Sequence, residues 1–173
     1  MGIRYEHAPE IQSEVNEIAA TLFPHVKLDS VVCLRSYGSS SRGTIARCHA
    51  LGKAMQLALG RKGFYVIEVI SKRYDKMPEH EKTKTLIHEL MHIPKSFGGG
   101  FIHHDIVHER NVDKMYQRYC SLKNKNPLDP RYRDFDLYED NNLTPGQKIE
   151  REFFVVLEKK ETPVRKKNWW FSN

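Results

Sequence analysis

The residues best suited to chemistry lie between positions 88 and 108, which hold five of the nine histidines in the chain. The stretch HELMH places His88 and His92 four residues apart, with Glu89 directly after the first. On a helix, side chains four residues apart project from one face, so two imidazoles can hold one metal ion beside the carboxylate. A bound zinc ion lowers the pKa of its water to about 7, and a carboxylate can accept the proton. The pattern predicts metal-assisted hydrolysis with Glu89 as general base.

Further imidazoles follow this pentad closely. His103, His104 and His108 all lie within sixteen residues of His92. A catalytic zinc ion commonly takes three protein ligands and leaves a fourth position for water. One of these histidines is therefore expected to complete the site, and the spacing alone leaves the choice among them open.

A helix is expected to carry the pentad. Pro78 is suited to the first helical position, and Glu79 and Glu81 to the first turn, where negative charge is favoured. The helix should run to about residues 92–93, because Pro94 disfavours the helical conformation of the residue before it. The histidines would then lie late in the helix, beside apolar residues that can exclude water from the site. These residues are Leu86, Ile87, Leu90 and Met91.

Three strands and two further helices are expected around this helix. Strands over residues 31–38 and 44–51 are separated by the turn-rich stretch GSSSRG and should pair as a hairpin. A third strand, over residues 64–71, precedes the helix and would supply a sheet edge to which an extended chain can add. Apolar residues at intervals of three and four predict amphipathic helices over 8–23 and about 105–122. Their apolar faces would consist of Ile11, Val15, Ile18, Ala19 and Leu22 in the first, and of Val112, Met115, Tyr116 and Tyr119 in the second.

At these residues the sequence resembles a known family. HELMHIPKSFGGG followed by a histidine, with YVIEVIS upstream, is similar to the metallopeptidases found in archaea and phages, a compact group of HExxH zincins. Minigluzincins and SprT-like proteases are related small zincins. The resemblance covers about residues 30–120 and implies an α+β fold, in which a mixed sheet packs against the active-site helix. It also implies one zinc ion and hydrolysis of peptide bonds in a protein or peptide substrate.

The resemblance also bears on the third ligand. The family pattern has a single ligand-like histidine at the place of His104, which implies that His104 joins the two histidines of the pentad. In this chain His103 stands before that position and Asp105 after it. His103 and His108 stay alternatives, either as ligands or as donors to the transition state, and Glu109 is a further alternative ligand. Asp105 would orient a liganding imidazole through its other nitrogen.

Basic residues are concentrated in one segment of a chain whose net charge is +6. Residues 31–76 carry nine basic and two acidic side chains, so their balance is +7 and the remainder of the chain carries −1. Such a segment is either a solvated basic face or a surface for nucleic acid, with Arg35, Arg42 and Arg47 as candidate contacts. The alternative function is a zinc-stabilised module without catalysis that binds nucleic acid or a nucleoprotein complex.

Length and composition predict one zincin-like domain over residues 1–125, followed by a charged extension over 126–173 that packs on it or trails from it. The aromatic tail KKNWWFSN would dock on the core or reach the cleft as a plug. Three cysteines without a C-x-x-C pair are expected to be reduced. The apolar runs are too short to cross a membrane and the first residues lack a signal-peptide pattern, so a cytoplasmic location is expected. The oligomeric state is left open.

Overall fold

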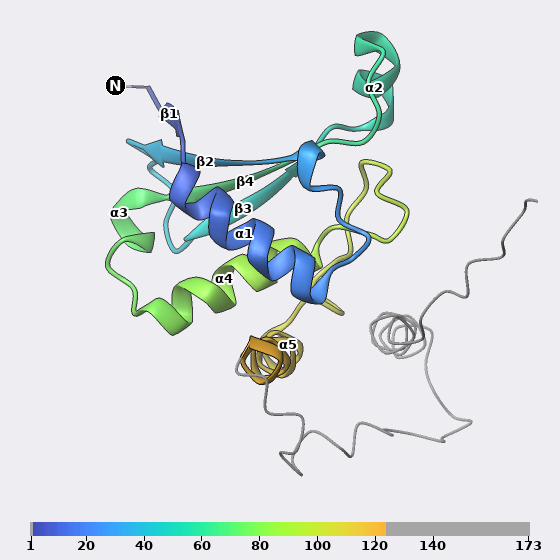
Figure 1. The fold of residues 1–173 in the computed structure, drawn as a ribbon. Coiled ribbons are helices and arrows are strands. Elements are labelled where there is room, and N and C mark those ends of the chain that lie inside the picture. Colours follow the sequence, from blue (N-terminus) through green and yellow to red (C-terminus); the bar gives the residue numbers. More distant parts are fainter. Residues whose placement is uncertain (1, 124–173) are drawn as a thin grey trace, which may run out of the picture. The chain divides into compact units, whose positions relative to one another are not determined.

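A computed structural model describes residues 2–123 (Figure 1). Within them, four strands form one sheet in the order β1-β2-β4-β3, with β1 at Arg4–His7, β2 at Val31–Tyr37, β3 at Ala46–Ala50 and β4 at Tyr65–Ile70. β2 and β4 run parallel, whereas β1 is antiparallel to β2 and β3 is antiparallel to β4. The sheet is therefore mixed, and together with its helices it forms an α+β fold, as predicted.

The central position of β4 corrects the predicted pairing of the strands. β2 and β3 do not form a hairpin, because β4 lies between them: Cys33 of β2 and Cys48 of β3 both pair with Ile67. Strand β4 reads YVIEVI and is almost entirely buried. A continuous apolar run is favoured in the middle of a sheet, where both of its edges are paired and its faces can be covered. The turn signals at residues 38–43 are local, and they carry no information about which strand pairs with β2.

Helix α1, Pro9–Leu22, confirms the first predicted amphipathic helix. It contacts β2 and packs against two further helices, α4 and α5 (Figure 1). Gln12 on this helix binds the backbone of the strand. Its side-chain oxygen accepts the N–H of Cys33 at 2.8 Å, and its nitrogen donates to the Val31 carbonyl at 3.1 Å. The predicted apolar face is buried in full, namely Ile11, Val15, Ile18, Ala19 and Leu22.

Helix α4, Glu79–Met91, carries the pentad and contacts β3 and α1. Pro78 lies just before the helix rather than at its first position, because its ψ of 150° is extended. His92 follows the last helical residue but keeps helical dihedral angles, so it still shares a face with His88. The apolar residues predicted to surround the histidines are all buried: Leu86, Ile87, Leu90 and Met91.

Helix α5, Glu109–Lys123, begins four residues later than the predicted start at residue 105, and it packs against α1 and α4. Residues 103–108 form a turn instead, in which the His103 carbonyl accepts the N–H groups of Ile106 and Val107 at 3.1 and 3.0 Å. His103 and His104 are therefore held by a loop and not by a helix. On the inner face of α5, Val112, Met115 and Tyr119 are buried and Tyr116 is half-buried.

Four short elements were not predicted: β1, a 3-10 turn at Leu28–Ser30, helix α2 at Lys53–Leu59 and helix α3 at Ser71–Tyr74. α2 buries none of its residues, so no amphipathic pattern marks it. The three cysteines are free, as expected. Among the described helices, none combines the length and the apolar character that crossing a membrane requires. The predicted extension over residues 126–173 and its aromatic tail lie outside the described residues.

Candidate metal centre

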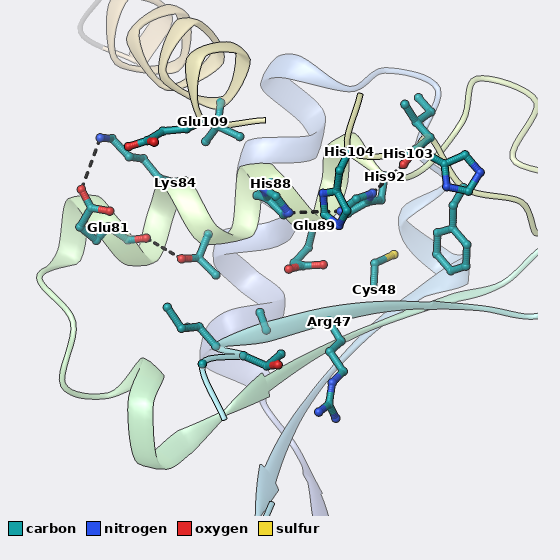
Figure 2. Close-up of a pocket in the computed structure, with 18 of the residues that line it drawn as sticks. Arg47, Cys48, Glu81, Lys84, His88, Glu89, His92, His103, His104 and Glu109 are labelled. Atoms are coloured by element: carbon teal, nitrogen blue, oxygen red, sulfur yellow. Dashed lines mark hydrogen bonds and ion pairs between the residues drawn. The ribbon is translucent and has the colours of Figure 1, made fainter. Parts of the chain in front are cut away.

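Three imidazoles converge at the end of α4 (Figure 2). His88 and His92 project from the end of the helix, and His104 approaches them from the loop that precedes α5. One nitrogen from each ring lies within 4.8 Å of the other two, and the Nε2 atoms of His88 and His92 are 3.2 Å apart. The structure thus brings together the three histidines that were predicted as metal ligands. Three imidazole nitrogens are a donor set that zinc takes in catalytic sites.

Backbone carbonyls orient two of the rings. The Nδ1 atom of His92 lies 2.7 Å from the Ile102 carbonyl, and that of His104 lies 3.1 Å from the Val107 carbonyl. A carbonyl accepts hydrogen bonds and cannot donate them, so Nδ1 donates and each neutral ring offers the lone pair of Nε2 to the site. Liganding histidines are commonly oriented in this way. Asp105, the predicted partner of a liganding ring, is exposed, and at His104 the Val107 carbonyl takes that role.

Burial keeps the two helical imidazoles neutral. It lowers the pKa of His88 to about 4, and positive charge on His92 and His104 would lower it further. Burial also lowers the pKa of His92, and the hydrogen bond to Ile102 opposes that shift. Neutral imidazole is the form that binds a metal ion. At neutral pH neither ring therefore needs to lose a proton before a metal ion binds.

Glu89 lies beside the three rings and extends from α4 toward β3 (Figure 2). The residue is only 6% exposed. Burial raises the pKa of its carboxyl group to about 7, although a hydrogen bond from the backbone N–H of Cys48 favours the charged form and opposes this shift. A carboxyl group with a pKa near neutrality can both accept and release a proton at pH 7. Its position and its pKa suit the general base predicted from the sequence.

The histidines open into a cleft of about 780 Å³. Residues 43–49, which include most of β3, line one side, and α4 lines the other (Figure 2). Lys84 on α4 lies one turn before His88 and is held by two carboxylates: its Nζ is 3.3 Å from Glu81 and 2.9 Å from Asp113. Because Asp113 belongs to α5, the ion pair between Lys84 and Asp113 joins the two helices at the border of the cleft. A cleft between a strand and a helix can admit an extended chain.

The remaining predicted site residues take separate positions. His103 and Glu109 are exposed and line the cleft, but within residues 2–123 neither belongs to the converging set of nitrogens. His108 is half-buried, and its Nε2 lies 3.2 Å from the side-chain nitrogen of Asn111. His103 and Glu109 are thus placed to contact a ligand in the cleft, whereas His108 is directed toward α5.

Two of the three arginines predicted to contact nucleic acid are engaged by carboxylates. Arg35 lies 2.6 Å from Glu10 and 2.5 Å from Asp75. Arg47 lies 3.6 Å from a buried carboxylate on β4 and points away from the histidines (Figure 2). Arg42 is exposed. These ion pairs reduce the positive charge that residues 31–76 can offer to a nucleic acid.

The structure adds cleft residues that sequence reasoning missed. Cys48 lines the cleft close to Glu89 (Figure 2). Phe101 lines it near His92, and the centroids of these two rings are 6.5 Å apart. The order of the strands brings Cys48 to the site, and the path of the loop after α4 brings Phe101. No pattern in the sequence predicts either position. Lys84 did leave one, because it precedes His88 by four residues and so lies on the same helix face.

Comparison with models of known protein families gives a match. A family model described as "Putative phage metallopeptidase" matches residues 3–123, well over half of the 173 residues. The matched range contains every described strand and helix, together with the three converging histidines and Glu89. Comparisons with curated proteins and with solved structures give no match. The chain therefore belongs to the family described as "Putative phage metallopeptidase".

Proposed function

We propose that the chain is a zinc-dependent peptidase that hydrolyses peptide bonds in a protein or peptide. The observation that carries the proposal is the approach of nitrogens from His88, His92 and His104 to within 4.8 Å of one another, beside the buried carboxyl group of Glu89. Neutral imidazoles suit zinc better than magnesium or calcium, which prefer oxygen ligands. When bound, zinc would polarise the scissile carbonyl and lower the pKa of a water molecule.

Glu89 is the proposed general base. Its carboxylate oxygen would accept a proton from the attacking water and deliver it to the nitrogen of the leaving amine. The raised pKa of about 7 supports both steps, because the carboxylate is a stronger base than an exposed one and its protonated form is still a usable acid. The backbone N–H of Cys48 would hold the carboxylate in place during both transfers.

The position of β3 supports a peptide as the substrate class. Within residues 2–123 this strand pairs with β4 alone and forms one edge of the sheet. The same strand lines the cleft. An extended peptide can add to the edge of a sheet through main-chain hydrogen bonds, with its alternate side chains directed into pockets. A peptide bound in this way would run past Glu89 and the three histidines.

Hydrolysis of a labelled unfolded protein by the zinc-loaded chain and by Glu89→Gln tests the proposal. Glutamine keeps the shape of the side chain but cannot accept a proton at neutral pH. Glu89→Gln should therefore retain zinc and lose activity by about 10²- to 10⁴-fold. Glu79→Gln, which alters an exposed carboxylate in the first turn of the same helix and outside the residues that line the cleft, is the matched control and should stay close to wild type. Activity retained by Glu89→Gln, or absent from the zinc-loaded wild type, contradicts the proposal.

The alternative of a zinc-stabilised module that binds nucleic acid stays a prediction, as does the cytoplasmic location. The ion pairs of Arg35 and Arg47 weigh against the first of these. Titration of single- and double-stranded nucleic acid at several salt concentrations distinguishes the two functions. Affinity that falls steeply with salt would support the binding module, and the absence of such binding would remove it.

A further inference from the structure

The loop that joins α4 to the third histidine is anchored by one buried side chain. Tyr65, the first residue of β4, is 0% exposed. Its hydroxyl group donates to the Gly100 carbonyl and accepts the N–H of Gly99, each at 3.0 Å. The hydroxyl group thus binds two successive residues of the loop, once as a hydrogen-bond donor and once as an acceptor.

The ring of Tyr65 contacts the same loop at both ends. Phe97 packs edge-on against it with ring centroids 4.8 Å apart, and the centroid of Phe101 lies 6.4 Å away. Phe97 has a φ of 47°, a left-handed conformation that is unfavourable for residues other than glycine. Such a conformation persists where surrounding contacts determine it. At Phe97, the packing against the ring of Tyr65 is one of these contacts.

Close packing leaves this loop little room for another path. Gly99 has a φ of 84°, and a Cβ atom at this position would lie 2.2 Å from the Leu51 carbonyl oxygen. Gln56 of α2 contacts the loop as well: its side-chain nitrogen donates to the Gly98 carbonyl at 3.0 Å and to the Leu51 carbonyl at 2.6 Å. Residues 97–101 are therefore held from β4 by a tyrosine and from α2 by a glutamine.

The anchored stretch leads directly into the candidate metal centre. Ile102 lies two residues after Gly100, and it makes two hydrogen bonds with His92. Its N–H donates to the His92 carbonyl at 2.9 Å, and its carbonyl accepts from His92 Nδ1 at 2.7 Å. His104 follows two residues later. Only one residue separates Gly100 from Ile102, and one more separates Ile102 from His104, so a different backbone path at Gly99 and Gly100 changes where these two residues can lie.

We propose that Tyr65 is a positioning residue of the metal centre: its hydroxyl and ring set the path of residues 97–101, and this path sets the orientation of His92 and the position of His104. The inference rests on the proposed zinc site. Loss of the hydroxyl would remove the partner that ties the N–H of Gly99 and the carbonyl of Gly100 to β4. Gly99 is half-buried and Gly100 is exposed, so both groups can bond to water instead, and the loop is then free to take another path.

The test compares Tyr65→Phe with Tyr119→Phe. Each variant removes one hydroxyl from a buried tyrosine. Tyr119 donates to Glu17 of α1 at 2.9 Å and is not among the residues that line the cleft. The zinc affinity of the full chain is measured by competition with a chromogenic chelator, beside the Tm of the metal-free proteins. Tyr65→Phe should weaken zinc binding by up to about 10- to 100-fold, which is the effect of losing a group that bonds a ligand directly. Tyr119→Phe should leave the affinity unchanged, even where both variants lower the Tm.

Cobalt substitution supplies a readout that a general loss of stability does not change. Visible absorption of bound Co²⁺ depends on the geometry of its ligands. At saturating Co²⁺, Tyr65→Phe should therefore alter the spectrum, and Tyr119→Phe should reproduce that of the wild type. Gln56→Ala is the second variant, because it releases the same loop at Gly98 from a helix with no buried residue. It should weaken zinc binding in the same direction, and it decides the test where Tyr65→Phe does not fold.

An unchanged zinc affinity and cobalt spectrum in Tyr65→Phe would overturn the positioning role, as would equal losses of affinity in Tyr65→Phe and Tyr119→Phe. Failure of the proposed function would look different. Zinc binding without peptide hydrolysis in the wild type would remove the peptidase and leave the role of Tyr65 standing. A wild-type chain that binds no zinc would remove both.

Discussion

His92 and Ile102 are joined by two hydrogen bonds, although they lie ten positions apart in the sequence. The His92 carbonyl accepts the N–H of Ile102 at 2.9 Å, and His92 Nδ1 donates to the Ile102 carbonyl at 2.7 Å. The pair closes the loop over residues 93–101 at its base. It therefore ties the orientation of a helical imidazole to the backbone segment that carries His104.

Replacement of His104 by alanine should remove zinc from the protein. The change deletes one of three nitrogens that lie within 4.8 Å of one another, and two imidazoles hold zinc more weakly than three. His103→Ala, which removes the exposed neighbour, should keep about one zinc ion per chain. Elemental mass spectrometry of the purified variants measures this ratio. Zinc lost from His103→Ala and kept by His104→Ala would show that the third ligand is misassigned.

Replacement of Asp105 by alanine should leave zinc affinity unchanged. The sequence favoured Asp105 as the group that orients a liganding ring, whereas in the structure the Val107 carbonyl lies 3.1 Å from Nδ1 of His104. A backbone carbonyl is not altered by a side-chain substitution at a neighbouring residue. Chelator competition on Asp105→Ala and wild type provides the comparison. A loss of about 10- to 100-fold would assign the orienting role to the carboxylate after all.

In the metal-free protein, Glu89 should make stability depend on pH. Its pKa rises from 4.5 to about 7 on folding, so between these values the folded state binds more protons than the unfolded state. The stability that this group contributes is therefore fully present below about pH 4.5 and is lost as the pH rises through about 7. Glutamine does not ionise. Relative to wild type, Glu89→Gln should gain roughly 2–3 kcal/mol between pH 5 and pH 8.

Urea unfolding in the presence of a chelator measures this difference, with both proteins compared at the two pH values. His88 and His92 titrate in both proteins, so their contribution cancels to first order. The same free-energy difference at pH 5 and at pH 8 would contradict a raised pKa for Glu89.

Replacement of Leu90 by alanine should destabilise the fold. Leu90 lies between His88 and His92 in the sequence and is 0% exposed, so its truncation should cost about 2–5 kcal/mol. Leu57 on α2 is 86% exposed, and Leu57→Ala should change stability by no more than about 0.5 kcal/mol. Denaturant unfolding of both variants gives the two values. Similar losses would contradict the placement of α4 against the core.

Local periodicity in the sequence was enough to predict which residues share a helix face. Spacing of four residues places His88 and His92 on one face of a helix, and the same helix period placed Ile11 and Val15 on the buried face of α1. Such positions follow from the geometry of one helix, whatever packs against it. The resemblance to the family indicated His104 as the third metal ligand, whereas spacing alone did not distinguish it from His103 and His108.

The way in which the strands, helices and loops pack together could not be predicted from such local patterns and is seen only in the fold. The fold placed β4 between β2 and β3, so that β3 and not β4 lies along the cleft and brings Cys48 to Glu89. It also supplied the carbonyls of Ile102 and Val107, where the sequence suggested a carboxylate. Strand order and loop path depend on contacts between residues far apart in the chain. The free energy of those contacts exists only in the assembled fold, so no local pattern in the sequence records it.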